Sequence, residues 1–496
     1  MTVHHVDILI LGSGFGGSLL SMILARAGRS VAVVDRARHP RFAIGESSTP
    51  LADSTLAALA EQYNLSELPP LTKYGTWKRY YPGITCGPKR GFSYIGHSED
   101  RELCEADRML VTASNSEETS DTHWLRSDVD AFLFEQAGRH GVVQFQGATY
   151  TLAGNDDDGW SVTGVANASG FEISAPFIVD ATGSDSALLA HLNVPSQTEV
   201  LRTNSRAIFG HFANVATVDS MLRDSGLDCR CHPFPCDAAA VHHVMPNSWM
   251  WQLRFDDETV SAGLMLDNRH SAAPASLEIS AADEWDQQLQ NCSFLRRQFA
   301  TAAVVRPDSG LQRTERLQRL TSRTAGRNWA ALPNTAGFID PLHSTGIAHT
   351  LFGIKRLAAI LLAPITDQRT ERLVRYSQQI IDELRNVDDL VEGCYAALPN
   401  FRLWCDWCML YFAAVTSMEQ SSTEENASFL RANDDAFRTA TREARSRMQR
   451  VIDEGSTPQG CKEFEDMLRS LLQPWNHVGL LDTDCRGMYS RTAAPA

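Results

Sequence analysis

The amino-acid sequence predicts an α/β fold: a parallel sheet with helices, an inserted antiparallel sheet domain and a helical C-terminal region. Residues 6–36, VDILILGSGFGGSLLSMILARAGRSVAVVDR, read as a strand, a glycine turn, a helix and a second strand. Both strands are continuous apolar runs, which is typical of a parallel sheet covered by helices on both faces. From about residue 200 to 267 the pattern turns to strands, and roughly the last 130 residues show helical periodicity.

Length and composition restrict the class of protein. The 496 residues exceed the size of one hydrophobic core, so we expect two or three domains. The content of 43% hydrophobic and 21% charged residues is ordinary for a soluble globular protein. A net charge of −15 argues against nucleic acid or an anionic membrane as a partner, because both favour a basic face. With eleven cysteines and no secretory leader, we expect reduced thiols, a cytoplasmic location and no membrane segment.

The first strand leads into a G-x-G-x-x-G motif made by Gly12, Gly14 and Gly17. The first glycine permits a tight turn, the second lets the backbone approach a pyrophosphate, and the third brings the helix onto the sheet. Asp35 closes the second strand, where its carboxylate can accept a hydrogen bond from a ribose hydroxyl. Within this unit, which fits NAD and FAD equally well, we expect two further cofactor contacts, from Phe15 and Arg36.

Later segments favour FAD. VDATGSDS (179–186) and AGFIDPLHSTGIAHTL (336–351) resemble the second and third cofactor segments of the flavoprotein monooxygenase group. GESSTP (45–50) and HWLRSDVDAFL (123–133) complete that match. The resemblance implies a Rossmann-like FAD-binding domain of the aromatic-hydroxylase type. It also implies cofactor contacts from Ser47, Arg126, Asp180, Ala181, Gly183, Asp340 and Ile347.

ITCGPKRGFSY, residues 84–94, reads as a strand that carries a lysine on an uncrowded face. Alternate residues of a strand share a face, so Lys89 is grouped with Gly91 and Ser93, whereas Phe92 points the other way. By itself, a lysine in such a place is more often a solvated residue at the end of a strand.

Within the monooxygenase group, the chain most resembles the flavin-dependent halogenases, especially those that act on phenols. The resemblance covers nearly the whole length, from the glycine turn through CGPKRGF and HHVMPNSWMW to FRLWCDWCMLYF. Lys89 matches the position of the lysine that those enzymes require, and Trp249 and Trp251 match the pair in their W-x-W-x-I-P motif. The third match is the loop beside the flavin, which contains His343, Ser344, Thr345 and Gly346.

This resemblance implies a halogenation that uses reduced FAD, O₂ and chloride or bromide. The backbone N–H groups of Thr345 and Gly346 would hold the halide, since fixed dipoles leave it more nucleophilic than a tightly paired counter-charge. The halide would be converted to hypohalous acid. Lys89, with Ser344 facing it, would hydrogen-bond this acid or be chlorinated itself, and arginine would serve neither role well.

The same resemblance places the organic substrate. The two tryptophans would separate the flavin from the substrate, and His343 would lie on the substrate side. A Trp-x-Trp on a strand puts both rings on one face, which by itself more often indicates core packing. The substrate would be a phenol or another electron-rich aromatic molecule, free or carrier-bound. Because the single dinucleotide motif is assigned to FAD, we expect a separate flavin reductase, and an enzyme that is a monomer or a dimer.

Two alternative functions stay open from the sequence. Leu253 and Arg254 replace the Ile-Pro of the tryptophan motif, which favours an FAD monooxygenase that hydroxylates an aromatic ring, such as a free or protein-bound tryptophan. The third class is a flavin-bound protein without turnover, acting as a binding partner in a biosynthetic assembly. The product mass with and without halide separates the first two.

The expected domain boundaries follow the segments above. The FAD-binding domain takes residues 1–78, 106–195 and 318–365, the antiparallel substrate domain takes 79–105 and 196–317, and the helical region takes 366–496. No metal is predicted, because the cysteine-rich stretch DCRCHPFPCD fits no common zinc spacing. Cys405 and Cys408 form C-x-x-C within an apolar helical pattern, which indicates buried structural thiols.

Overall fold

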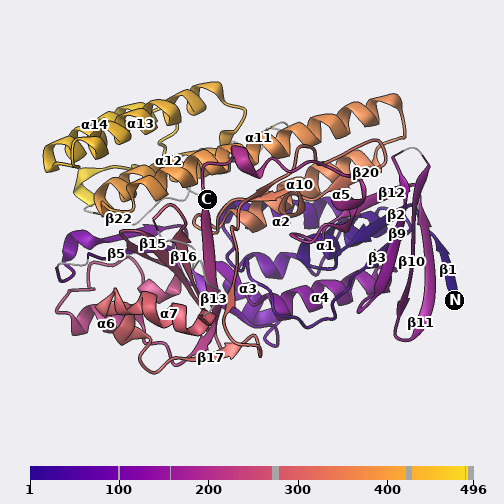
Figure 1. Ribbon diagram of the computed structural model, residues 1–496, viewed down its shortest axis with the longest axis horizontal. Helices are drawn as coiled ribbons and strands as arrows, with labels where there is room; N and C mark the ends of the chain where they lie inside the picture. The colour runs from indigo at the N-terminus through magenta and orange to yellow at the C-terminus, as the bar shows by residue number, and fades with distance from the viewer. Residues whose placement is uncertain (99–100, 157, 271–278, 421–426, 486, 490–496) are drawn as a thin grey trace.

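The computed structural model describes residues 1–98, 101–156, 158–270, 279–420, 427–485 and 487–489. Figure 1 shows a parallel sheet with its helices on the right, a large sheet on the left and the C-terminal helices along the top. The chain starts at the outer edge of the first region and crosses between the two sheets several times. The predicted α/β class is confirmed.

The parallel sheet is the base of the first region. Its order is β20 (Trp329–Ala331), β12 (Phe177–Asp180), β2 (Ile8–Leu11), β3 (Val31–Val34) and β8 (Val143–Phe145). Side chains alternate along β2, so Ile10 packs against α1 (Phe15–Arg26) whereas Leu9 packs into a separate apolar layer. Both faces are buried, as the apolar runs predict.

The two faces are covered differently. α1 covers one face, with α4 (Arg126–Arg139) and α10 (Thr345–Leu362) packed beside it. The expectation of helices on both faces was wrong, because a second sheet covers most of the other face and buries Trp160 and Phe171 against it. The order of that sheet is β1 (Thr2–His5), β11 (Ser169–Ala175), β10 (Gly159–Ala166) and β9 (Thr149–Asn155).

The large sheet is mainly antiparallel. Its order is β17 (Ala303–Arg306), β13 (Ser205–Ala213), β16 (Val260–Asp267), β15 (Ser248–Arg254), β14 (Ala240–Met245), β5 (Gly91–Gly96), β6 (Arg108–Thr112) and β22 (Met488–Tyr489), with β18 (Gln312–Arg313) beside β13. The pairs β14–β5 and β6–β22 are parallel. β6 pairs with β5 although it follows the expected domain boundary at residue 105, and the division into domains stays a prediction.

The two faces of the large sheet have different neighbours. One face packs on α6 (Val218–Asp224), α7 (Ala281–Gln290) and α8 (Ser293–Gln298). The other face carries both tryptophans of the WMW segment, Trp249 and Trp251, together with Phe92 and Tyr94. The prediction that the tryptophan rings share a face is confirmed, and α12 (Phe401–Gln420) covers this face at Phe92 and Tyr94.

Long helices dominate the C-terminal region, as predicted. They are α11 (Asp367–Ala397), α12, α13 (Asp435–Asp453) and α14 (Pro458–Leu472). In the described part of the chain, α10 is one helix that is long and apolar enough to cross a membrane. It is mostly buried, packed between α1, α2 and α11, which is the setting of a core helix.

Short elements connect these regions. The helices are α2 (Pro50–Tyr63), α3 (Tyr74–Tyr80), α5 (Ala187–His191) and α9 (Pro333–Ala336). The strands are β4 (Cys86–Lys89), which pairs with β7 (Asp121–Trp124), and β19 (Arg319–Leu320), which pairs with β21 (Gly337–Phe338).

Candidate active site

The glycine turn forms a tight backbone cradle at the carboxyl end of β2. Gly12 has φ of 96°, and a Cβ there would lie 2.5 Å from the carbonyl oxygen of Ala181. A Cβ on Gly17 would lie 2.0 Å from the carbonyl oxygen of Gly12. Gly14 is the N-cap of α1 and has no capping side chain, so the first N–H groups of this helix are available to a phosphate. These features fit the pyrophosphate of FAD.

Cationic side chains converge on this helix N-terminus. The position of a Cβ on Gly14 lies 3.4 Å from Arg41 Nη2 and 3.7 Å from Arg126 Nη2. Arg126 donates to the carbonyl oxygens of Ile44 (3.0 Å) and Gly45 (3.1 Å), which joins the GESSTP loop to α4. Asp130 Oδ2 lies 3.6 Å from the same position and pairs with Arg126, so the free helix N–H groups and Arg41 are the features that favour an anionic ligand.

Three more predicted cofactor residues surround this turn. Phe15 lies under the guanidinium of Arg126, 4.9 Å from its Cζ. Ser47 forms a bridge with His123, and its buried Oγ has no hydrogen-bond partner among the described residues, as expected of a group that awaits a ligand. The guanidinium of Arg36 lies 5.3 Å from the ring centre of Tyr150.

Asp35 lies beside the glycine turn, as predicted. Its Oδ2 accepts hydrogen bonds from Ser13 N and Ser13 Oγ, both at 2.7 Å, and its Oδ1 accepts from Ala37 N at 2.8 Å. Arg41 lies 3.6 Å away. These contacts fix the carboxylate at the end of β3, where remaining lone pairs can accept from a ribose hydroxyl.

The second and third cofactor segments meet at neighbouring strand ends. Ala181 N donates to Leu11 O at 2.7 Å, and Leu332 N donates to Asp180 O at 2.9 Å. The Asp180 carboxylate accepts from Thr182 and Ser186 within its own turn, and burial raises its pKa. The residue just before the third segment also contacts the second, because Gly183 N donates to Thr335 Oγ1 at 3.0 Å. Segments far apart in the sequence thus form one edge.

The loop before α10 is the predicted halide site. Ser344 is in the left-handed region (φ 53°) at the N-cap, and Thr345 and Gly346 begin the helix. The N–H groups of a first helical turn have no intrahelical acceptor, so they can bind an anion. The cavity beside this turn is lined by Asn334, Gly337, Phe338, Ile339, Asp340, Thr345, Gly346, His349, Thr350, Leu384 and Val387. Ile347 is not in this lining and is buried in the core.

Asp340 is tied to the first tryptophan through a tyrosine. Tyr395 donates to Asp340 Oδ2 at 2.8 Å and accepts from Trp249 Nε1 at 3.1 Å. Ser205 also donates to Asp340 Oδ2, at 3.3 Å, and Leu342 N donates to Oδ1. Burial raises the pKa of Asp340 to about 7. No sequence motif pointed to Tyr395, which comes from α11.

Trp251 joins a second polar network. Its Nε1 donates to Ser261 (3.3 Å), Ser261 donates to Glu46 (2.7 Å), and His211 lies 2.8 Å from the other oxygen of Glu46. A Cβ on Gly263 would overlap the indole ring, so that glycine makes room for it. Both tryptophans are buried and do not line the cavity beside the start of α10. Their role as a barrier between flavin and substrate stays a proposal.

Lys89 is placed differently from the expectation. The strand breaks at Arg90, whose N–H donates to Ala238 O, and β4 and β5 join different sheets. Lys89 and Phe92 were expected on opposite faces, but Nζ lies 4.2 Å from the Phe92 ring centre. The expected open face was also wrong: the side chain is fully buried, and Nζ donates to Ser48 O at 2.6 Å.

A buried acidic pair compensates the lysine. Lys89 lies opposite Asp121 in the β4–β7 register, and the charge of Asp121 repels that of Asp53 in α2. Burial lowers the pKa of Lys89 to about 8, while Asp121 and Asp53 act in the opposite direction. Burial raises the pKa of both carboxyl groups, and Lys73 lies 3.6 Å from each. No sequence motif indicates this network, because Lys89, Asp121 and Asp53 come from separate elements.

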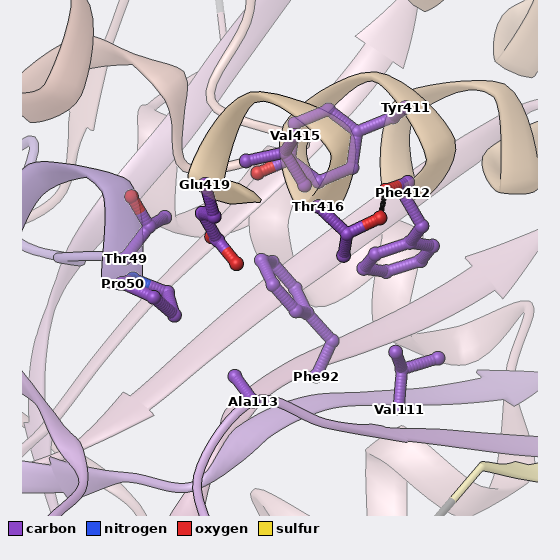
Figure 2. Close-up of a pocket in the computed structure, with 10 residues that line it drawn as sticks. All are labelled: Thr49, Pro50, Phe92, Val111, Ala113, Tyr411, Phe412, Val415, Thr416 and Glu419. Atoms are coloured by element: carbon purple, nitrogen blue, oxygen red, sulfur yellow. Dashed lines mark hydrogen bonds between the residues drawn. The ribbon is translucent and has the colours of Figure 1, made fainter. Parts of the chain in front are cut away.

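A cavity lies under α12, next to the lysine. Figure 2 shows its lining, which is contributed by the start of α2, by β5 and β6, and by one face of α12. The lining consists of Thr49, Pro50, Phe92, Val111, Ala113, Tyr411, Phe412, Val415, Thr416 and Glu419. Phe92 therefore contacts both the cavity and the Lys89 ammonium.

His343 connects this cavity to the halide loop. Its ring stacks on Tyr411 with centres 4.3 Å apart and an angle of 4° between planes. Burial lowers the pKa of His343 to about 3, so the ring is neutral. Its Nε2 lies 3.6 Å from Cys394 Sγ, which is 3.8 Å from Cys408 Sγ. The donor atoms of His343, Cys394 and Cys408 lie within 4.8 Å of one another, and the absence of a metal here stays a prediction.

The cysteine-rich loop also brings donor atoms together. Atoms of Asp219, Cys229 and His232 lie within 4.8 Å of one another. Arg108 Nη1 lies 2.7 Å from His232 Nε2, and this positive charge disfavours a cation beside the histidine. That this loop holds no metal remains a prediction.

A family model described as tryptophan halogenase matches residues 106–445. The monodechloroaminopyrrolnitrin halogenase PrnC of Pseudomonas fluorescens is 30% identical over 81% of this chain and 70% of its own length. The chain belongs to the tryptophan halogenase family. The tetracycline 7-halogenase of Kitasatospora aureofaciens is 29% identical, over 80% of this chain and 71% of its own.

The fold of this family is also found among solved structures. The crystal structure of halogenase PltM in complex with phloroglucinol and FAD matches with a TM-score of 0.84 at 23% identity, over 98% of this chain and 99% of that one. The chain is a flavin-dependent halogenase, with FAD and halide as its cofactors, and the halogenase assignment is favoured over the hydroxylase alternative.

Proposed function

We propose that this halogenase chlorinates or brominates a free phenol or another free electron-rich aromatic molecule, and that Lys89 delivers the halogen. The observation that carries the proposal is the position of the Lys89 amine, buried against the Phe92 ring that lines the cavity under α12. Aromatic side chains there, including Tyr411 and Phe412, suit a flat aromatic substrate.

The cofactor edge has a separate task. Reduced FAD, when bound, supplies with O₂ the oxidising power that converts halide to hypohalous acid. The glycine turn and Arg126 hold its pyrophosphate, and Asp35 orients a ribose. The N–H groups of Thr345 and Gly346 hold the halide without a full counter-charge, which keeps it nucleophilic.

Lys89 then binds the hypohalous acid or is halogenated by it. With a pKa of about 8, the amine is mainly an ammonium at pH 7 but holds a neutral fraction. The ammonium can hydrogen-bond hypohalous acid and make its halogen more electrophilic, and the neutral amine can be halogenated; both roles require a primary amine. Ser344 belongs to the adjacent loop and faces this step. Trp249 and Trp251 separate flavin from substrate, and His343 supports the substrate side through Tyr411.

We propose that the substrate is free rather than carrier-bound. Two relatives named for carrier-bound pyrrole substrates are each only 22% identical to this chain, whereas the relatives at 30% and 29% are named for small molecules. We further propose a separate flavin reductase, since one dinucleotide turn is assigned to FAD, and a cytoplasmic enzyme that is a monomer or a dimer.

The test uses the FAD-loaded protein with a flavin reductase, NADH, O₂, bromide or chloride, and a panel of phenols. Mass spectrometry should show a halogenated product that depends on halide. Lys89→Met keeps the volume and removes the amine, and it should lower product formation at least 1,000-fold, equivalent to about 4 kcal/mol, while flavin reoxidation continues. The exposed Lys355→Met is the matched control. Bromination by Lys89→Met at the wild-type rate would refute the role of the lysine.

A further inference from the structure

The cavity under α12 has an acidic wall residue that the proposed chemistry does not use. Figure 2 shows the carboxylate of Glu419 between Phe92 and the start of α2 at Thr49. The other wall residues are apolar or carry a hydroxyl, and the Thr416 hydroxyl already donates to Phe412 O at 2.7 Å. Glu419 is therefore the acidic group of this described lining.

The Glu419 side chain is half-buried, and its carboxylate has no direct partner among the described residues. No described residue donates a hydrogen bond to it, and the charged groups that act on it do so from a distance. Lys73 and Lys89 attract it, and Asp121 repels it; Tyr411, on the same helix, is the titratable neighbour in the cavity wall. A half-buried carboxyl group in a largely apolar wall has few hydrogen-bond donors around it, so a ligand that supplies one gains by filling this place.

We propose that Glu419 selects the substrate by accepting a hydrogen bond from an O–H or N–H group on the aromatic ring. This inference rests on the proposed function and narrows its substrate class to neutral rings with such a donor, namely phenols and aromatic amines. The ring itself packs on Phe92 and Phe412. Rings with a carboxylate are excluded, because the largely apolar wall of this cavity would remove water from the carboxylate without replacing its hydrogen bonds.

The raised pKa of Glu419 is consistent with its role as a hydrogen-bond acceptor for the substrate. Burial raises the pKa of Glu419 to about 8, with repulsion from Asp121 as the second cause, and Lys73 and Lys89 oppose the rise. The carboxyl group is therefore mainly neutral at pH 7 and ionises as the pH rises through 8. A phenol that binds in its neutral form then meets an acceptor that strengthens with pH, until the phenol itself ionises near pH 10.

Binding to the oxidised, FAD-loaded enzyme tests the proposal without turnover. The probes are resorcinol and its dimethyl ether, which share a ring shape and differ in O–H groups. Calorimetry should show wild-type enzyme binding resorcinol at least tenfold more tightly than the ether. In Glu419→Met the two affinities should lie within threefold of each other. Glu419→Gln should keep the preference, because its amide oxygen accepts a hydrogen bond, but should lose the change with pH around 8.

The control and the refuting results are separate. Glu443→Met removes an exposed carboxylate on α13 and should leave the preference unchanged. A tenfold preference that persists in Glu419→Met would refute this inference, as would tight binding of a hydroxybenzoate. If wild-type enzyme with reduced FAD, O₂ and bromide brominates none of the phenols, the proposed function fails instead. If it brominates resorcinol while Glu419→Met keeps the preference, only the role of Glu419 fails.

Discussion

The cofactor edge and the proposed halogen-transfer site of this halogenase depend on different interactions. At the cofactor edge, backbone atoms approach so closely that glycine is required, as at Gly12 and Gly17. At the transfer site, Lys89 and the acids Asp53 and Asp121 are all buried and balance one another's charge. The first region depends on steric fit within a short segment, and the second on electrostatic balance between distant segments. Substitutions should therefore fail in different ways.

The largest effect on cofactor binding is expected from Gly17→Ala. Its new Cβ would lie 2.0 Å from Gly12 O, so the turn must shift away from the pyrophosphate. We expect FAD affinity, measured by flavin fluorescence titration, to fall at least 100-fold, or about 3 kcal/mol. Gly83→Ala is the matched control, since a Cβ there meets no atom within 4 Å. Unchanged FAD affinity in Gly17→Ala would remove the steric basis of the comparison.

Asp340 lies on the cofactor side, but its pKa is controlled by burial rather than by steric fit. Its pKa of about 7 lies above the unfolded value, so its contribution to stability is present at low pH and is lost as the pH rises through 7. Asp340→Asn should therefore gain about 2–3 kcal/mol relative to wild type between pH 5 and pH 8. Urea unfolding at the two pH values measures this difference.

The exposed Asp286→Asn on α7 is the control for Asp340 and should show the same stability difference from wild type at both pH values. A difference between Asp340→Asn and wild type that does not change with pH would mean that Asp340 is not a buried acid with a raised pKa.

Asp121→Asn tests the electrostatic balance directly. Asp121 raises the pKa of Lys89 against the effect of burial, so its loss should move that pKa further below 8. We expect turnover to fall about tenfold, equivalent to about 1.4 kcal/mol, and the pH profile to shift to lower pH. Product formation measured from pH 6 to 9 gives both quantities. A profile that keeps its wild-type midpoint would show that the acid does not control the amine.

The smallest effect is expected from Trp251→Phe. The indole is held in the core through Ser261, so its loss should cost about 1–2 kcal/mol of stability. Halogenation should stay within threefold of wild type. Thermal unfolding and product mass measure the two effects, with Trp285→Phe, buried beneath the other face of the large sheet, as the control. A hydroxylated product from Trp251→Phe would show that a phenylalanine ring is too small to keep flavin and substrate apart.

The sequence by itself determined the α/β class, the glycine turn, the position of Asp35 and the shared face of the two tryptophans. These features follow from short-range rules of strand alternation, helix termini and backbone clearance, which a continuous stretch of residues specifies. The flavin-dependent halogenase resemblance added the family, and the matches to known halogenases confirm it.

Only the tertiary structure decided the setting of Lys89. Strand alternation predicted that Lys89 lies on an open face. Because the strand breaks at Arg90, Lys89 is instead buried opposite Asp121. Likewise, Tyr395 and Glu419 became part of the site only because α11 and α12 pack over strands that lie far away in the sequence. The physical reason is that burial and charge balance depend on which segments meet in space, and local periodicity carries no information about that meeting.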